Sequence, residues 1–201
     1  MIFFILLFLL CFSCQEPPPV GEIDFVAQIE KHRREKDASF KISEDSPIPD
    51  ERKTKFQGLS YFPIDLNYRF QVRLHPYSQK ETFEIVTSSG MLRETMKYGY
   101  FKFKVDSSQC VLQVYKLLDI QSNYPNYLFV PFLDATTGKE SYAGGRYLDF
   151  EENDSGIYTL DFNLAYNPSC AYGKAGYNCP IPPAENRLNV AIYAGERYTT
   201  F

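Results

Sequence analysis

The run YRFQVRLH at residues 68–75 alternates apolar and polar side chains, and this period of two recurs along most of the chain. One face of the run carries the apolar side chains Tyr68, Phe70, Val72 and Leu74. The other face carries arginine and glutamine. Because successive side chains of a β-strand point to opposite faces, the alternation predicts a strand with one face in a core and the other in water.

Seven further segments have strand-like patterns: residues 82–90, 98–106, 110–118, 127–134, 145–152, 157–166 and 187–196. The chain contains 16 Tyr and 17 Phe, and both residue types favour strands. Only a short polar stretch separates residues 68–75 from 82–90, so these two segments predict a hairpin. Close spacing and turn-rich linkers predict a mainly β fold, an antiparallel β-barrel or sandwich of about eight strands.

A helix is predicted at the start of the domain, over residues 22–40. Ile23, Val26 and Ile29 recur at helical spacing, and charged residues fill the later turns. Two prolines and a Ser/Asp cluster then predict a loop over residues 43–53.

The first residues predict export. Residues 2–12 are apolar, but at about 1.5 Å per helical residue they are too short to span a bilayer core of roughly 30 Å. They are typical of a signal peptide, although no Lys or Arg precedes them. The sequence CFSC resembles a lipobox and predicts cleavage after residue 13 with lipid on Cys14; a cleaved signal peptide without lipid is the alternative. We therefore expect a membrane-anchored lipoprotein of the bacterial cell envelope, with residues 14–22 as a tether.

Export also constrains the cysteines. Processing would remove Cys11 and modify Cys14, which leaves Cys110, Cys170 and Cys179. An oxidising compartment permits a disulfide between Cys170 and Cys179, which are close enough in sequence to close a small loop, or the two thiols are merely neighbours. Cys110 alternates with apolar residues and is interpreted as a buried thiol.

Composition narrows the chemistry. The net charge of −4 argues against a nucleic-acid partner, which requires a basic face. The only histidines, His32 and His75, lie far in sequence from the polar C-terminal region, which disfavours a histidine-based catalytic triad. We expect no metal and no cofactor, and the sequence makes no prediction of oligomeric state.

Polar residues in the C-terminal half suggest one ligand pocket. Arg146 shares its predicted strand face with Leu148 and Phe150, so an inward Arg146 would need a carboxylate or a ligand anion. Tyrosines could wall such a pocket, with Tyr142 among them. The alternative is that the polar side chains simply face water. The candidate ligand-binding residues are Arg146, Tyr147, Asp149, Asp161, Asn163, Tyr166, Tyr172, Glu185 and Asn186.

Four segments carry a resemblance to a known family: FQGLSYFPID, YGYFKFKV, LFVPFLDATTGKESYAGGRYLDF and LDFNLAYNPSCAYGKAGYNCPIPPAENRLNVAIYAGE. They resemble the DUF1684 family of bacterial and archaeal proteins of unknown function, over residues 23–196. Arg33, Lys36 and Asp37 also resemble an R-x-x-K-D segment of that family. The resemblance implies a single domain over residues 23–201 and a shared site, and it carries over no catalytic role.

Three functions remain open. The first is a binding module for a small polar or amphipathic molecule. The second is a hydrolase that uses two carboxylates, for which Asp149, Asp161, Glu185 and Glu196 are available. The third is a structural envelope protein without a ligand.

Overall fold

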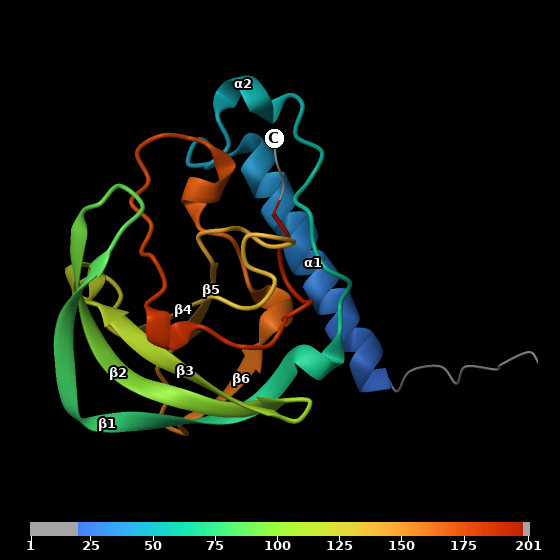
Figure 1. Cartoon of the computed structure of the whole chain (residues 1–201). Coiled ribbons are helices and arrows are strands. Elements are labelled where there is room, and N and C mark those ends of the chain that lie inside the picture. Colours follow the sequence, from blue (N-terminus) through green and yellow to red (C-terminus); the bar gives the residue numbers. More distant parts are fainter. Residues whose placement is uncertain (1–19, 199–201) are drawn as a thin grey trace, which may run out of the picture.

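The computed structural model describes residues 20–198 (Figure 1). Helix α1 (Val20–Ile42) and the short α2 (Asp50–Lys53) come first. The strands are β1 (Arg69–Val86), β2 (Leu92–Val105), β3 (Ser108–Leu117), β4 (Tyr127–Phe132), β5 (Arg146–Glu151) and β6 (Ile157–Asp161). Short 3-10 helices are η1 (Leu66–Tyr68), η2 (Leu118–Ile120), η3 (Phe162–Leu164), η4 (Ser169–Tyr172) and η5 (Ala184–Asn186).

The predicted signal peptide and Cys14 lie outside the described residues. Residues 20–22 of the predicted tether form the start of α1. The predicted helix is therefore present and slightly longer than residues 22–40. None of the helices within residues 20–198 is both long and apolar enough to cross a membrane.

The six strands form one antiparallel sheet in the order β5-β4-β3-β2-β1-β6. Strands β5 and β6 lie at opposite edges of this order, although only residues 152–156 connect them. Because so few residues span about 20 Å at most, the sheet must curl until its edges approach each other. Tyr147 of β5 and Tyr166 after β6 exchange backbone hydrogen bonds across the gap. The result is a half-barrel.

The predicted hairpin between residues 68–75 and 82–90 is wrong, because both segments belong to the single long strand β1. Its first residues pair with β6 and the remainder pairs with β2. A register shift between Pro76 and Glu81 absorbs the polar stretch that resembled a turn. Opposite it, a Cβ on Gly99 would lie 2.6 Å from the carbonyl oxygen of His75, so only glycine allows this close approach.

The predicted strand at residues 187–196 is also absent, which leaves six strands among the described residues where about eight were expected. This segment has only isolated bridges, at Arg187 and Glu196. Its apolar side chains are nevertheless buried: Ile192 and Ala194 are both 0% exposed. In this segment the alternation of apolar and polar residues therefore reflects the burial of every second side chain and not the pairing of a strand.

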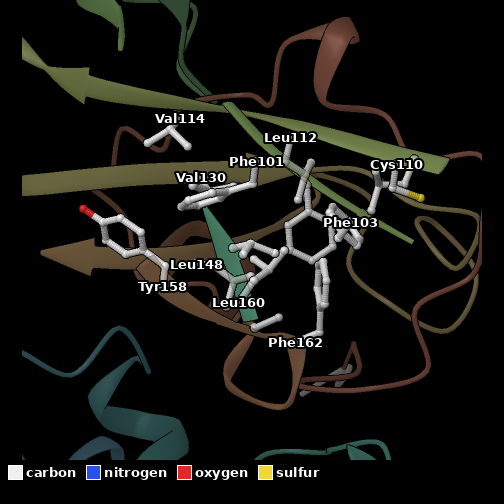
Figure 2. Close-up of a cluster of buried hydrophobic side chains, with 14 of the residues drawn as sticks. Phe101, Phe103, Cys110, Leu112, Val114, Val130, Leu148, Tyr158, Leu160 and Phe162 are labelled. Atoms are coloured by element: carbon white, nitrogen blue, oxygen red, sulfur yellow. The ribbon is translucent and has the colours of Figure 1, made fainter. Parts of the chain in front are cut away.

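The main core fills the inside of the half-barrel (Figure 2). The apolar faces predicted from the alternation supply it, with Phe101 and Leu112 both 0% exposed. Phe162 is central to the aromatic contacts of this core, and its ring packs against those of Phe103 and Phe132. Cys110 is a buried free thiol within this cluster, as predicted.

A second apolar cluster lies apart from the main core, on residues of β3, β4, β5 and the C-terminal loop. Phe129 and Tyr147 pack edge-to-face with ring centroids 4.8 Å apart. The loop that covers them is closed by a disulfide between Cys170 and Cys179, whose Cα atoms lie 6.3 Å apart. The disulfide thus closes residues 170–179 of the C-terminal loop, residues 168–187, on themselves. The Thr87–Pro180 bridge and the hydrogen bond from the N–H of Ser88 to the carbonyl of Cys179 attach this loop to the end of β1.

Candidate functional site

Two adjoining cavities lie between α1 and the segment that follows β6, and together we call them the groove. The larger cavity measures about 280 Å³ and the smaller about 220 Å³. His32, Leu164 and Tyr166 line both. The larger cavity is completed by Leu148, Asp149, Phe150, Thr159 and Asp161. The smaller is completed by Arg33, Lys36, Tyr61, Asn163, Ala165 and Glu196.

Asp149 is the most accessible carboxylate of the groove. Tyr127 donates a hydrogen bond to its Oδ1 at 2.7 Å, and Tyr166 donates to its Oδ2 at 2.6 Å. Solvent reaches this side chain, yet the concave surface surrounds it with protein, and this desolvation raises the pKa of Asp149. The two phenols act in the opposite direction, since each stabilises the carboxylate.

Asp161 and Asn163 are placed by the start of η3. Asp161 Oδ1 accepts hydrogen bonds from the backbone N–H of Asn163 at 2.9 Å and from its side-chain amide at 3.0 Å. The Asn163 amide also bonds both the N–H and the carbonyl of Asp65, at 2.9 Å each. Burial raises the pKa of Asp161, while Arg69 lies 3.5 Å from its Oδ2. These contacts fix the positions of Asp161 and Asn163 in the wall of the groove.

Glu196 is a buried carboxylate, 1% exposed, behind the smaller cavity. Its Oε1 forms an ion pair with Lys36 of α1. Its Oε2 accepts hydrogen bonds from Tyr172 and, at 2.9 Å, from the N–H of Asn167. Burial raises the pKa of Tyr172 well above its usual range. All of these contacts tie α1, η4 and the C-terminal segment together.

Arg33 projects from α1 into the smaller cavity. Its Nη1 donates to the carbonyl of Phe62 at 3.0 Å, and its guanidinium carbon lies 4.5 Å from the centre of the Tyr61 ring. Its Nε and Nη2 are buried and have no hydrogen-bond partner within residues 20–198. Lys36, one turn later, lies 4.8 Å from the centre of the Tyr166 ring.

The structure brings four of the nine sequence-predicted residues to the groove: Asp149, Asp161, Asn163 and Tyr166. Tyr172 supports the groove through Glu196. The remaining four lie elsewhere: Arg146, Tyr147, Glu185 and Asn186.

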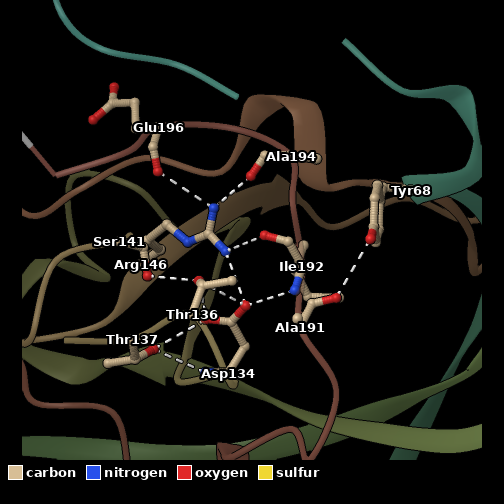
Figure 3. Close-up of polar contacts among 10 residues, drawn as sticks. All are labelled: Tyr68, Asp134, Thr136, Thr137, Ser141, Arg146, Ala191, Ile192, Ala194 and Glu196. Carbon is tan, nitrogen blue, oxygen red and sulfur yellow. Dashed lines mark hydrogen bonds and ion pairs between the residues drawn. The ribbon is translucent and has the colours of Figure 1, made fainter. Parts of the chain in front are cut away.

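Arg146 is buried in an ion pair with Asp134, at 3.2 Å, with both side chains at most 1% exposed (Figure 3). It also donates to the carbonyls of Ile192 at 2.9 Å, of Glu196 at 3.3 Å and of Ala194. Desolvation lowers the pKa of Arg146, and Asp134 opposes this. A protein carboxylate and three carbonyls therefore occupy Nη1 and Nη2, while Nε has no hydrogen-bond partner within residues 20–198. Because Arg146 lines neither cavity of the groove, we place no ligand there.

Glu185 and Asn186 lie beside the middle of β2 and β3. Glu185 pairs with Lys97 and accepts a hydrogen bond from Tyr115 at 2.7 Å. Asn186 is fully buried, and its side-chain amide donates to the carbonyl of Pro131 at 2.7 Å. Tyr147 donates to the carbonyl of Pro180. These residues anchor the C-terminal loop to the sheet.

Sequence reasoning did not assign the α1 residues of the groove, His32, Arg33 and Lys36, to a pocket. Lys36 follows Arg33 by three residues and His32 by four, so it is a neighbour of each on the helix surface, which was a usable signal. The packing of that face against the residues after β6 is a long-range feature and has no local signature.

Comparisons with known proteins show a family and a solved structure to which this chain is similar. Residues 54–197 match the family model described as "Protein of unknown function (DUF1684)". The solution NMR structure of an uncharacterized protein from gene locus rrnAC0354 of Haloarcula marismortui is similar, with a TM-score of 0.65 and 37% identity. The match covers 88% of this chain and 96% of that one. Among proteins with curated descriptions, none matches this chain.

Proposed function

This chain belongs to the DUF1684 family of proteins of unknown function, and we propose a function for it from the residues that line the groove. The groove binds a small polar or amphipathic molecule. The observation that carries the proposal is the lining of the two cavities, which combines hydrogen-bonding groups with apolar and aromatic walls. Sites for small molecules are concave, are mostly apolar and contain a few well-placed polar groups.

Each part of the lining has a role in this proposal. The carboxylate of Asp149 accepts hydrogen bonds from ligand hydroxyl or amide groups. Leu148, Phe150 and Leu164 contact the apolar part of the ligand. Tyr166 lines both cavities and bridges the two parts.

The proposal includes a location. We infer that residues 1–13 are a signal peptide and that lipid on Cys14 anchors the protein to the bacterial envelope. The apolar N-terminal run supports this. The disulfide between Cys170 and Cys179 supports it independently, because disulfides persist in oxidising compartments outside the cytosol.

The experiment is native mass spectrometry of the protein purified from membranes of the cells that produce it. We expect an adduct of a small molecule, and a mass increment on Cys14 from the lipid. Leu164→Trp should remove the small-molecule adduct, because Leu164 is 37% exposed and lines both cavities. Val111→Trp is the matched control, since Val111 is similarly exposed at 41% and lines neither cavity. An adduct that survives Leu164→Trp, or a wild-type protein without one, would contradict binding in the groove.

A carboxylate-dependent hydrolase is the alternative, and one observation favours it. Asp149 and Asp161 line the same cavity, and desolvation raises the pKa of both. Carboxylates with raised pKa values in a cleft are typical of general acids. Under this alternative, Asp149→Asn or Asp161→Asn would leave the bound molecule intact and undegraded, whereas the wild type would convert it.

A further inference from the structure

The hydrogen bonding of the Arg33 guanidinium indicates which chemical group the ligand of the groove carries, an inference that rests on the proposed function. Two contacts fix the guanidinium plane: the hydrogen bond from Nη1 to the Phe62 carbonyl and the packing on the Tyr61 ring. The unpartnered nitrogens are Nε and Nη2. In arginine these two atoms form one edge of the planar fork, the edge that binds two oxygens of a carboxylate or phosphate side by side.

Within residues 20–198, no carboxylate forms a hydrogen bond with this edge of the guanidinium. Glu196, Glu30 and Asp161 all favour the charged form of Arg33. Glu30 forms an ion pair with Arg34 at 3.7 Å. Glu196, however, uses its two oxygens for Lys36 and for Tyr172 with Asn167. Asp161 bonds Asn163 through Oδ1, and its Oδ2 faces Arg69.

Burial without a partner is unfavourable for a guanidinium, and desolvation lowers the pKa of Arg33. Arg33 is half-buried as a residue, whereas Arg146 is fully buried and has the carboxylate of Asp134 as its ion-pair partner. Within the part of the chain that the structure describes, Arg33 therefore has two free donors, Nε and Nη2, whose hydrogen bonds an anion from outside the chain could accept.

We propose that Arg33 binds an oxyanion group of the ligand, a carboxylate or a phosphate, in the smaller cavity of the groove through its Nε and Nη2. The remainder of the ligand extends past Tyr166 into the larger cavity, where Asp149 and Asp161 disfavour a second negative charge. The ligand class is thus a small molecule with an anionic end and a neutral body that carries hydroxyl or amide groups.

The experiment is a titration of ¹⁵N-labelled protein with two probes, sodium acetate and inorganic phosphate, at constant ionic strength set with chloride. The Nε–H signal of Arg33 reports the contact directly, and its absence from the Arg33→Gln spectrum assigns it. We expect this signal to shift with saturation, and Arg33→Gln to weaken the affinity of the better probe about tenfold, as loss of a charge-assisted bidentate contact implies. The stronger of the two probes identifies the group as carboxylate or phosphate.

The matched control is Arg34→Gln, which removes the same charge one position along α1. Arg34 is 69% exposed and pairs with Glu30, so its replacement should leave the affinity unchanged. Equal weakening in both variants, or a titration without saturation, overturns the inference. If a neutral molecule binds wild type and Arg33→Gln equally but does not bind Leu164→Trp, the groove is a binding site but the inference of an anionic group is wrong. If Leu164→Trp changes the binding of none of the molecules, the proposed function itself is wrong.

Discussion

Arg146→Met should cost a large share of the stability of this domain. The variant leaves the carboxylate of Asp134, whose side chain is 0% exposed, without its ion-pair partner. It also leaves the carbonyls of Ile192, Ala194 and Glu196 without a donor from this side chain. Removal of one partner of a buried ion pair costs about 3–5 kcal/mol. Against a total stability of about 5–15 kcal/mol, the melting temperature should fall by on the order of 10 °C.

The assay is urea denaturation followed by circular dichroism, with Arg187→Met as the control. Arg187 is exposed on the same C-terminal segment, and its replacement should change the free energy of unfolding by less than about 0.5 kcal/mol. Addition of Asp134→Asn to Arg146→Met should not restore stability, because the three carbonyls still lack a donor. A loss below about 1 kcal/mol with an unchanged m-value would refute this reasoning.

Two further predictions concern the C-terminal loop and the groove. Reduction of the bond between Cys170 and Cys179 should lower the free energy of unfolding by about 2–3 kcal/mol, as expected for so short a loop; identical urea midpoints with and without reductant would contradict this. For Asp149, whose pKa is raised in the folded state, ionisation opposes folding, so its contribution to stability falls as pH rises from the unfolded pKa of about 4 through the folded pKa. Replacement of Tyr127 and Tyr166 by Phe removes the donors that lower this pKa, and a carboxyl ¹³C titration should then give a higher midpoint; an unchanged midpoint would show that the phenols do not stabilise the carboxylate.

Alternation of side chains was sufficient to predict most of this fold, because burial on one face of a sheet is a local property of the sequence. The buried faces of β2 and β3 were predicted residue by residue, as Phe101 and Leu112 illustrate. The continuity of β1 was not predictable, since residues 76–81 have the composition of a turn. Only the facing Gly99 on β2, which has no side chain to collide with His75, allows the strand to continue.

The candidate site was partly predictable for a related reason. Asp161 and Asn163 were predicted as pocket residues because they are polar and lie opposite the apolar side chains of the predicted strand 157–166. That Asp161 caps η3 was not predicted, because the strand was expected to continue to residue 166. The inward position of Arg146 was also visible, but its partner Asp134 was not, because the long loop between β4 and β5 decides their approach. The contribution of Arg33 depends on how α1 packs against residues after β6, which no local pattern encodes.

The placement of Arg146 has a consequence for biosynthesis. Its carbonyl partner at Ile192 is 46 residues further along the chain, and those at Ala194 and Glu196 are later still. A nascent chain that has completed all six strands still holds a charged pair whose remaining partners have yet to be translated. Native closure therefore requires the segment from Ile192 to Glu196, and chains truncated before Ile192 should be substrates for chaperones and proteases.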